Sequence, residues 1–231
     1  SDAAGNAATV VQRTVIVSVA SSISFDSNGT CNCAGATVGD TEVINGTTYT
    51  VVDNSTIGGQ ANNGNVNLCT TLVTSMQNLF SGKANFNSDI GFWDTSNVTN
   101  MSRLFSDAFG FNQDISGWDV SKVTNMSQIF GGTAFNHDIS GWDISSVTIM
   151  QGMFSNTPVS YDLSGWDVSN VTNMVGMFGS TDYNHDISGW DVSNVTSFHS
   201  MFKRATSFNQ NIGTWNTSNV TIMNSMFTGA T

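Results

Sequence analysis

Apolar and polar side chains recur in a fixed order through most of the chain beyond residue 90. The clearest copy, WDVSKVTNMSQIF, runs from Trp118 to Phe130 and sets apolar residues at constant positions among Asp, Ser, Thr and Asn. All six tryptophans begin such a copy, at intervals of 24 or 25 residues: Trp93, Trp118, Trp142, Trp166, Trp190 and Trp215. A period of this length is typical of proteins in which successive coils stack and complete one another's core.

Each unit has two parts of constant length, with all length variation between them. Val123, Met126, Ile129 and Phe130 are spaced as on one face of a short helix or 3₁₀ turn. The ten methionines follow the same face, so they are predicted to fill the core. The other part, FNQDISGW ending at Trp118, is predicted to be one short strand of a parallel sheet between coils. The variable segment between the two parts is expected to be a loop.

The chain ahead of the array divides into two segments. Residues 1–20 include the β-branched run TVVQRTVIVSVA, which predicts a strand without a partner nearby in the sequence. Residues 21–67 are rich in Gly, Asn, Thr and Ser, and we interpret them as a small β-rich cap over the first coil. Residues 68–231 form the array, which starts with a degenerate copy at Leu68 and stops in mid-unit at Thr231. We therefore expect an array that is truncated at its C-terminal end.

Three cysteines precede the tryptophans. Cys31 and Cys33 are separated by one residue, which is a poor spacing for a bond between them. One of the two is therefore expected to form a disulfide with Cys69, and the other to remain unpaired. A disulfide favours an oxidising, extracellular location. The alternative, a zinc site, lacks a fourth ligand at metal-binding spacing.

The chain is acidic, with 17 Asp and Glu against 6 Lys and Arg and a formal net charge of −11. This balance argues against a nucleic-acid partner. No apolar run approaches the ~20 residues that a membrane span needs, so no span is expected in this segment. Ten of the acids form two repeated columns: Asp89, Asp114, Asp138, Asp162 and Asp186 in the first, and Asp94, Asp119, Asp143, Asp167 and Asp191 in the second.

Stacked carboxylates repel one another, so each column needs a compensating interaction. Hydrogen bonds from nearby backbone N–H groups, as in Asx turns, are one explanation, and calcium ions between the coils are the alternative. The last repeat carries Asn211 and Asn216 at the two positions. Because Asn keeps the acceptor and loses the charge that a cation needs, we favour backbone capping, without a cofactor, over calcium.

One position of the predicted strand varies from unit to unit while its neighbours stay constant. A varying column beside constant ones is expected to be exposed, and we take it as the first candidate for a recognition surface. A merely solvated strip is an equal alternative. Two histidines of the column lie two coils apart, too far to share a metal easily. The column consists of Ser88, Gln113, His137, Tyr161, His185 and Gln210.

The repeated phrase resembles the BspA-like leucine-rich repeats of surface proteins, in the form found in mycoplasma lipoproteins and marine Bacteroidota, with the signature WDVSNVTNMSxMF. The resemblance extends from about Val43 to Thr231 and includes the lead-in INGTTYTVVDNST. It implies an α/β repeat, a leucine-rich-repeat-like solenoid of short parallel strands and short helical turns behind the small β-rich cap. Residues 2–19, which begin DAAGN, resemble the last hairpin and strand of bacterial immunoglobulin-like modules, so an upstream Ig-like domain is expected. The alternative is an ordinary N-terminal strand that pairs within this domain.

These observations predict a non-enzymatic segment of a large bacterial protein at the cell surface or secreted from the cell. The repeat family that it resembles carries no catalytic residues, and its array implies adhesion, protein interaction or a role as a spacer. The expected partners are other modules of the same polypeptide and a surface protein or glycan.

Two alternatives come from other functional classes. The first is a carbohydrate-binding module in which the tryptophans form an exposed ladder for sugar rings. The second is a polysaccharide-cleaving enzyme with a pair of acids. Asp107 and Asp182 alone among the array's acids depart from the repeat, and neither lies in its constant parts. An enzyme is therefore the less favoured prediction.

Overall fold

All regular secondary structure of the described chain lies before residue 73. The computed structural model describes residues 22–230, so the strand expected within residues 1–20, and the Ig-like module inferred from it, lie outside the described residues. The helix and the strands are β1 (Ser24–Phe25), β2 (Cys31–Asn32), β3 (Thr41–Ile44), β4 (Thr47–Asp53), α1 (Ile57–Asn62) and β5 (Leu68–Leu72). No helix among residues 22–230 is long and apolar enough to cross a membrane.

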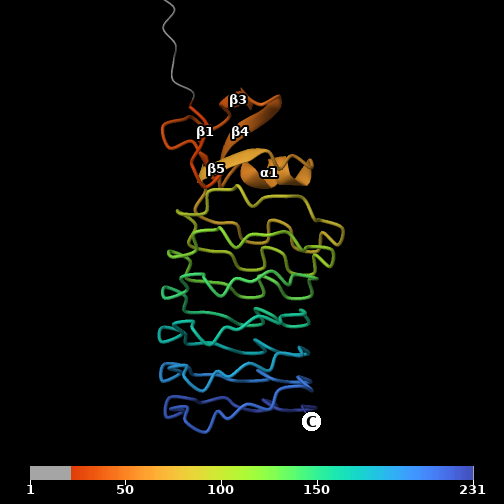
Figure 1. Ribbon diagram of the computed structural model, residues 1–231, viewed down its shortest axis with the longest axis vertical. Helices are drawn as coiled ribbons and strands as arrows, with labels where there is room; N and C mark the ends of the chain where they lie inside the picture. Colours follow the sequence, from red (N-terminus) through yellow and green to blue (C-terminus); the bar gives the residue numbers. More distant parts are fainter. Residues whose placement is uncertain (1–21, 231) are drawn as a thin grey trace, which may run out of the picture.

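The N-terminal part, residues 22–72, consists of two small sheets. β1 and β2 are antiparallel, and a second sheet has the order β3-β4-β5, with β3 antiparallel and β5 parallel to β4. Asn45 and Gly46 join β3 to β4 with φ angles of 52° and 81°, as a tight hairpin turn requires. The sheets and α1 lie together at one end of the molecule (Figure 1), where the N–H of Cys31 donates to the carbonyl of Phe92 at 2.8 Å.

The coil stack, residues 73–230, contains no helix or regular strand. Figure 1 shows its coils lying one above another beyond the N-terminal part. Single parallel bridges link equivalent residues of successive coils: Ser75, Asn100, Asn125, Ile149, Asn173, Ser197 and Ile222. The repeat seen in the sequence is therefore also a repeat in space.

The predicted α/β fold class is wrong. The described residues contain one six-residue helix and five short strands, and the repeats contain neither the helical turns nor the sheet strands that were expected. The N–H of Phe130 donates to Met153 of the next coil at 3.2 Å, and the N–H of Gln128 donates to Gln151 at 2.7 Å. In a helix the N–H of Phe130 would bond to Met126 instead. The protein is thus a set of small mixed sheets followed by stacked turns.

Left-handed backbone positions explain why the helices do not form. Each coil has two residues with positive φ, four positions apart, such as Gln128 and Gly132, and no α-helix accommodates such residues. Between them, the N–H of Ile129 turns back to the carbonyl of Met126 at 3.2 Å. Local turns and bonds to the next coil therefore alternate along the segment. The first left-handed position is occupied by Asn78, Arg103, Gln128, Gly152, Gly176, Ser200 and Ser225 in successive coils.

Aromatic rings form the centre of the core. The phenylalanines that end the phrases stack at centroid distances of 5.7–6.2 Å from coil to coil: Phe80, Phe105, Phe130, Phe154, Phe178, Phe202 and Phe227. Within most coils a second ring lies against the first, as Phe111 does on Phe105 at 3.7 Å. Nine of the ten methionines are also buried, and Met223 is 44% exposed. The prediction of a methionine-filled core is confirmed at those nine positions.

Candidate functional site

The varying column lies on one side of each coil, in what we call the rung segment: the eight residues that end at each tryptophan. Ser88 is exposed, whereas Gln113, His137, His185 and Gln210 are half-buried. The half-buried state has a local cause, because several of these side chains reach back to the preceding coil. The column is therefore less free for recognition than its variability predicted.

Three members of the column hydrogen-bond to backbone carbonyls of the coil before them. The Nε2–H of His137 donates to Asn112 at 3.0 Å, and that of His185 donates to Ser160 at 2.8 Å. Gln210 makes the equivalent contact through its Nε2, which donates to the carbonyl of Asn184 at 2.9 Å. Imidazole and carboxamide groups serve the same purpose here, since each supplies one N–H to an otherwise unpaired carbonyl.

Tyr161 does not belong to the exposed column. Its coil has Val159 where the other rung segments begin with an aromatic ring, and the Tyr161 side chain turns inward to fill part of that space. Its ring lies 6.4 Å from Phe154 in an edge-on arrangement. Burial raises the pKa of the Tyr161 hydroxyl well above its ordinary range, and the hydroxyl has no hydrogen-bond partner among the described residues.

The carboxylates of both Asp columns accept hydrogen bonds from the backbone two residues later. In the first column, Asp114 Oδ1 accepts from the N–H of Ser116 at 3.0 Å. In the second, Asp143 Oδ1 accepts from the N–H of Ser145 at 3.1 Å and from its hydroxyl at 2.6 Å. Asn211 makes the same contact with Gly213 at 3.0 Å. These are the Asx turns that the sequence predicted.

The hydrogen bonds lower the pKa values of several column members. The backbone N–H of Ser116 holds the pKa of Asp114 below its ordinary value, with a smaller contribution from the nearby His137. The N–H of Ser164 does the same to the pKa of Asp162, which lies near His185. For Asp143 the hydroxyl of Ser145 is the main cause of a lowered pKa. The capping interactions therefore favour the charged form despite the repulsion along the columns.

The members of the two Asp columns differ in their exposure to solvent. Asp94 is 6% exposed, because the N-terminal part covers it, whereas the other nine acids lie at the surface. Asp94 and Asp119 line a cavity of about 540 Å³ together with Asp26, but each of the three carboxylates already caps backbone N–H groups. Within residues 22–230 no group of three or more His, Cys, Asp or Glu side chains is arranged to hold a metal ion.

Two hydrogen-bonded ladders were not predicted. On the phrase side, the N–H and the hydroxyl of Thr124 both donate to the carbonyl of Thr99, at 2.9 and 3.2 Å. The same pair of bonds runs through Thr74, Thr99, Thr124, Thr148, Thr172, Thr196 and Thr221. In the rung segments, the side-chain oxygen of Asn112 accepts from the N–H of Asn136 at 3.0 Å. The signal in the sequence was the constant Thr in the phrases and the Asn that recurs in every rung segment except the one with Ser160.

The two sides of the stack differ in charge. The rung segment and the last part of the phrase pack their rings against each other, as the contact of Phe105 with Phe111 shows, so their exposed residues face opposite ways. The second Asp column lies at the beginning of the phrase, outside both segments. The rung segments carry the first Asp column. The segments from each ladder threonine to the next phenylalanine contain one charged residue, Arg103. We call the exposed surface of these seven segments the Thr face.

The tryptophans do not form an exposed ladder. All six indole rings are buried, with exposed fractions from 1% for Trp93 to 8% for Trp215. The Nε1–H groups of Trp118 and Trp190 donate to carbonyls of the preceding coil at 3.2 and 3.1 Å. Sugar rings have no access to these faces, so the carbohydrate hypothesis loses the surface on which it was based.

The cysteines pair as one of the two expected arrangements. Cys33 is bonded to Cys69, with 6.2 Å between their Cα atoms, and Cys31 is a buried free thiol. Burial, followed by the charge of Asp94, raises the pKa of the Cys31 thiol to about 12. The bond ties the segment after β2 to β5. Cys31 is therefore protonated and enclosed at neutral pH.

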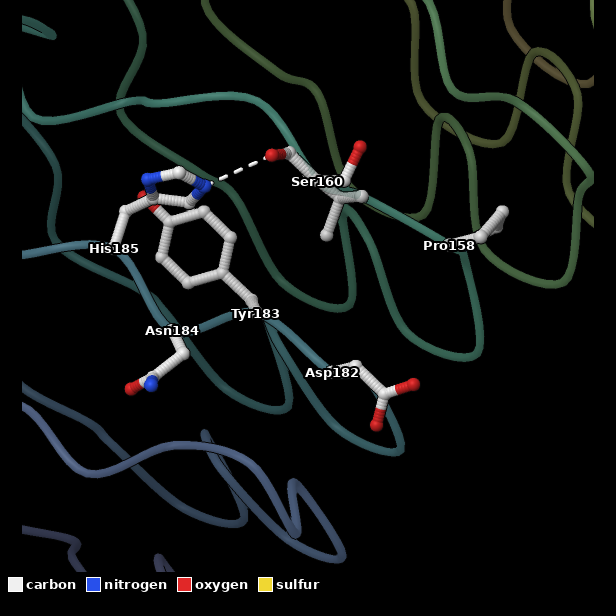
Figure 2. Close-up of a pocket in the computed structure, with 7 residues that line it drawn as sticks. Pro158, Ser160, Asp182, Tyr183, Asn184 and His185 are labelled. Carbon is white, nitrogen blue, oxygen red and sulfur yellow. Dashed lines mark hydrogen bonds between the residues drawn. The ribbon is translucent and has the colours of Figure 1, made fainter.

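Of the two acids that depart from the repeat, Asp182 lies beside a cavity and Asp107 does not line one of the cavities described here. The cavity measures about 300 Å³ and lies between two rung segments. Figure 2 shows its lining, with the Tyr183 ring between His185 and Pro158. The side chains of Asp107 and Asp182 belong to different coils, and no paired-carboxylate arrangement is found around the cavity.

The fold and its surfaces define a repeat protein whose unit is the Trp-to-Phe phrase with its rung segment. The chain belongs to the family described as "Mycoplasma protein of unknown function, DUF285", whose model matches residues 50–160 and 157–231. The matches cover the whole coil stack and part of the N-terminal sheets. No curated protein and no solved structure matches the chain. The expected relation to mycoplasma repeat proteins is confirmed at this level.

Proposed function

We propose that this chain is a non-enzymatic segment of a secreted or cell-surface protein, in which the coil stack holds an interaction surface at a fixed distance from its neighbours. The resemblance of the phrase to BspA-like surface repeats supports this proposal, and such repeats are related to the family. The disulfide supports an oxidising compartment, since such bonds persist outside the cytosol.

The observation that carries the proposal is the contrast between the two sides of the stack. Charged residues are depleted in the centres of protein interfaces, because their desolvation is costly. The Thr face has one charged residue, whereas the rung segments have a column of carboxylates. We therefore assign protein contacts to the Thr face and a solvated role to the acidic side.

The stack is also suited to act as a rigid support. Each coil donates four alternate N–H groups to the next, as Met126, Gln128, Phe130 and Gly132 do at 2.7–3.2 Å. The phenylalanine column runs through all of the coils in the same direction. A surface on such a support keeps its spacing, which favours binding by reducing the entropy lost on association.

A bead-binding assay tests the assignment. Beads coated with the full chain are applied to immobilised extracellular matrix proteins and to bacterial surface extracts, and retention under flow is measured. One variant places lysines on the Thr face at Gln77, Gln151 and Asn224, which are exposed. The matched control places lysines on the acidic side at Ser116, Ser140 and Ser164, also exposed.

The proposal predicts that wild-type beads are retained by at least one surface, that the Thr-face variant loses most of the retention, and that the control keeps it. Thermal unfolding of both variants verifies that the fold is intact. Retention equal to that of uncoated beads on every surface would overturn the display function. Retention that falls in the control and persists in the Thr-face variant would move the contact to the other side.

A further inference from the structure

One coil of the stack lacks the second ring of the repeat. Its rung segment, residues 159–166, begins with Val159, and we call it the Val159 segment. The rung segments before and after it begin with Phe135 and Tyr183, which stack on the phrase-ending rings of their own coils at 4.1 and 4.3 Å. Tyr161 fills part of the space, but its ring lies edge-on, at 79°, to the phrase-ending ring. The stacked pair of rings is therefore absent from this coil.

The missing ring also interrupts the packing between coils. Phe86, Phe111 and Phe135 stack in a column at 5.9 and 6.0 Å, and this column ends at the Val159 segment. Beyond that segment, a cavity of about 300 Å³ lies between residues 158–160 and 182–185. The Val159 segment is therefore loosely packed against the rung segments on both of its sides.

Unpartnered polar atoms gather at the same place. Within residues 22–230, three buried side-chain atoms have no hydrogen-bond partner: Nε1 of Trp142, Nε1 of Trp166 and the hydroxyl of Tyr161. The Nε1–H groups of the other four tryptophans each donate to a backbone carbonyl 27 or 28 residues earlier, at 3.0–3.2 Å. A buried donor without a partner is costly, because it loses its hydrogen bond to water. The rung side of the stack is thus least well satisfied around the Val159 segment.

The side chains that link other rung segments to the preceding coil do not link this one. His137 and His185 donate to carbonyls of the coil before them at 3.0 and 2.8 Å, and Figure 2 shows the second of these bonds. Tyr161 occupies the same position and turns inward instead. The N–H and the hydroxyl of Ser160 donate to the side-chain oxygen of Asn136 at 3.1 and 3.0 Å. In the described chain, these are the hydrogen bonds that remain between the two rung segments.

The phrase side of the same coil is complete. Its four N–H groups donate to the next coil at 2.7–3.0 Å: those of Met150, Gly152, Phe154 and Asn156. The ring of Phe154 stacks on Phe130 and on Phe178, at 5.9 Å in both cases. The weakness of this coil is therefore confined to one side.

We infer that the Val159 segment is a hinge of the stack, which opens on the acidic side while the phrase side stays hydrogen-bonded. Local opening begins where buried apolar contacts are few, and here they are few on one side. Asp162 and Asp186 repel each other along that side, which favours opening further. The coils before and after the hinge can then tilt relative to each other without breaking the threonine ladder of the Thr face.

This hinge goes beyond the proposed display function, because it concerns the shape of the stack and not what the stack binds. The hinge can open in a chain whose Thr face binds no partner. A closed hinge leaves the contacts of the Thr face as they are.

Amide hydrogen exchange of the full chain, followed residue by residue with NMR, tests the hinge. The backbone N–H of each rung-segment tryptophan donates to the residue three positions earlier at 3.0–3.2 Å, so these groups are matched probes. The N–H of Trp166 is expected to exchange at least about tenfold faster than that of Trp118. The N–H groups of Phe154 and Phe178 are expected to stay as protected as that of Phe105.

A repaired chain gives the Val159 segment the residues of positions 111–113. It carries Val159→Phe, Ser160→Asn and Tyr161→Gln together, and should lower the exchange rate at Trp166 to that at Trp118. Equal rates at Trp166 and Trp118 in the unaltered chain would overturn the hinge. So would a difference that the repair leaves unchanged.

The matched control transfers the defect to a regular coil. Phe111→Val, Asn112→Ser and Gln113→Tyr together should raise the exchange rate at Trp118, with thermal unfolding to check the fold; if this variant does not fold, the repaired chain decides. Exchange at Phe154 as fast as that at Trp166 would mean that the whole coil unfolds, which contradicts an opening on one side.

Discussion

The N-terminal part and the coil stack satisfy their backbones in different ways. In residues 22–72 the hydrogen bonds run between neighbouring strands, and the disulfide between Cys33 and Cys69 adds a covalent tie. In residues 73–230 the regular bonds run from each coil to the next, over separations of 23 to 26 residues. The first part is stabilised by local pairing and a crosslink, and the second by repetition.

This difference indicates which kind of change should destabilise each part. A single coil cannot complete its own structure, because four of its backbone N–H groups pair with carbonyls of the following coil. The N-terminal part has a small separate core of Ile23, Cys31, Cys33, Val51 and Cys69. A crosslink should therefore matter most there, and backbone conformation should matter most in the stack.

Removing the disulfide is expected to have the largest effect. A bond that spans 36 residues stabilises a fold by about 3–4 kcal/mol in the chain-entropy model. The double variant Cys33→Ala with Cys69→Ala should lose stability by that order, with the loss confined to the N-terminal part. Hydrogen exchange measured by mass spectrometry identifies the residues whose backbone N–H groups lose protection. Exchange that rises equally in residues 100–200 would mean that the two parts unfold as one unit.

Changing a left-handed position is expected to have a smaller effect, within the stack. Gly176 has a φ of 62° and free space around its missing Cβ, so Gly176→Ala adds backbone strain without a steric clash. We expect a loss of about 1 kcal/mol, measured by urea unfolding. Ser200 occupies the same position one coil later with a φ of 57°. Ser200→Gly is the matched reverse change and should raise stability by a similar amount; the same sign for both variants would contradict the strain argument.

Acid is expected to weaken the stack gradually, as the smallest effect per residue. The pKa values of Asp114, Asp143 and Asp162 are lowered in the folded chain by hydrogen bonds from Ser116, Ser145 and Ser164. Their contribution to stability is therefore complete above the ordinary carboxyl pKa of 3.8 and is lost as the pH falls through the lower folded values. Melting temperatures recorded from about pH 7 down to about pH 2 should fall only below about pH 4.

A neutral variant separates this effect from general acid unfolding. Asp143→Asn keeps an oxygen that accepts from the N–H of Ser145, as Asn211 does for Gly213. It should lower the melting temperature slightly at neutral pH and reduce the dependence on acid. A melting temperature that rises as the pH falls below 4 would show that repulsion between the carboxylates outweighs their capping bonds.

The sequence predicted the repeat in space and much of the core. The phrase identified the phenylalanines, nine buried methionines and the Asx turns of Asp114 and its equivalents, because burial and capping depend on residue type at a fixed period. The fold class was wrong because a spacing of three and four residues suits a helix and also a turn with left-handed residues. Glycine at left-handed positions, as at Gly132, Gly152 and Gly176, indicates such a turn, whereas Gln128 and Arg103 at these positions do not.

The candidate site was harder to predict than the core. The varying column was expected to be exposed, yet His137 and His185 reach back to carbonyls of the preceding coil. A long polar side chain can reach a backbone group one coil away, and variability does not reveal this. The inward turn of Tyr161 depends on the small side chain of Val159 two residues earlier, so it requires both positions to be considered together.

The identical donor pattern of every coil has a consequence for how such proteins change length. Four backbone N–H groups of one coil donate to carbonyls of the next coil, at the same positions as in the other coils: those of Met126, Gln128, Phe130 and Gly132. A duplicated or lost coil would therefore leave the same backbone hydrogen bonds at each remaining junction. The length of the coil stack can therefore change by whole coils through recombination within the gene, while the N-terminal part stays the same.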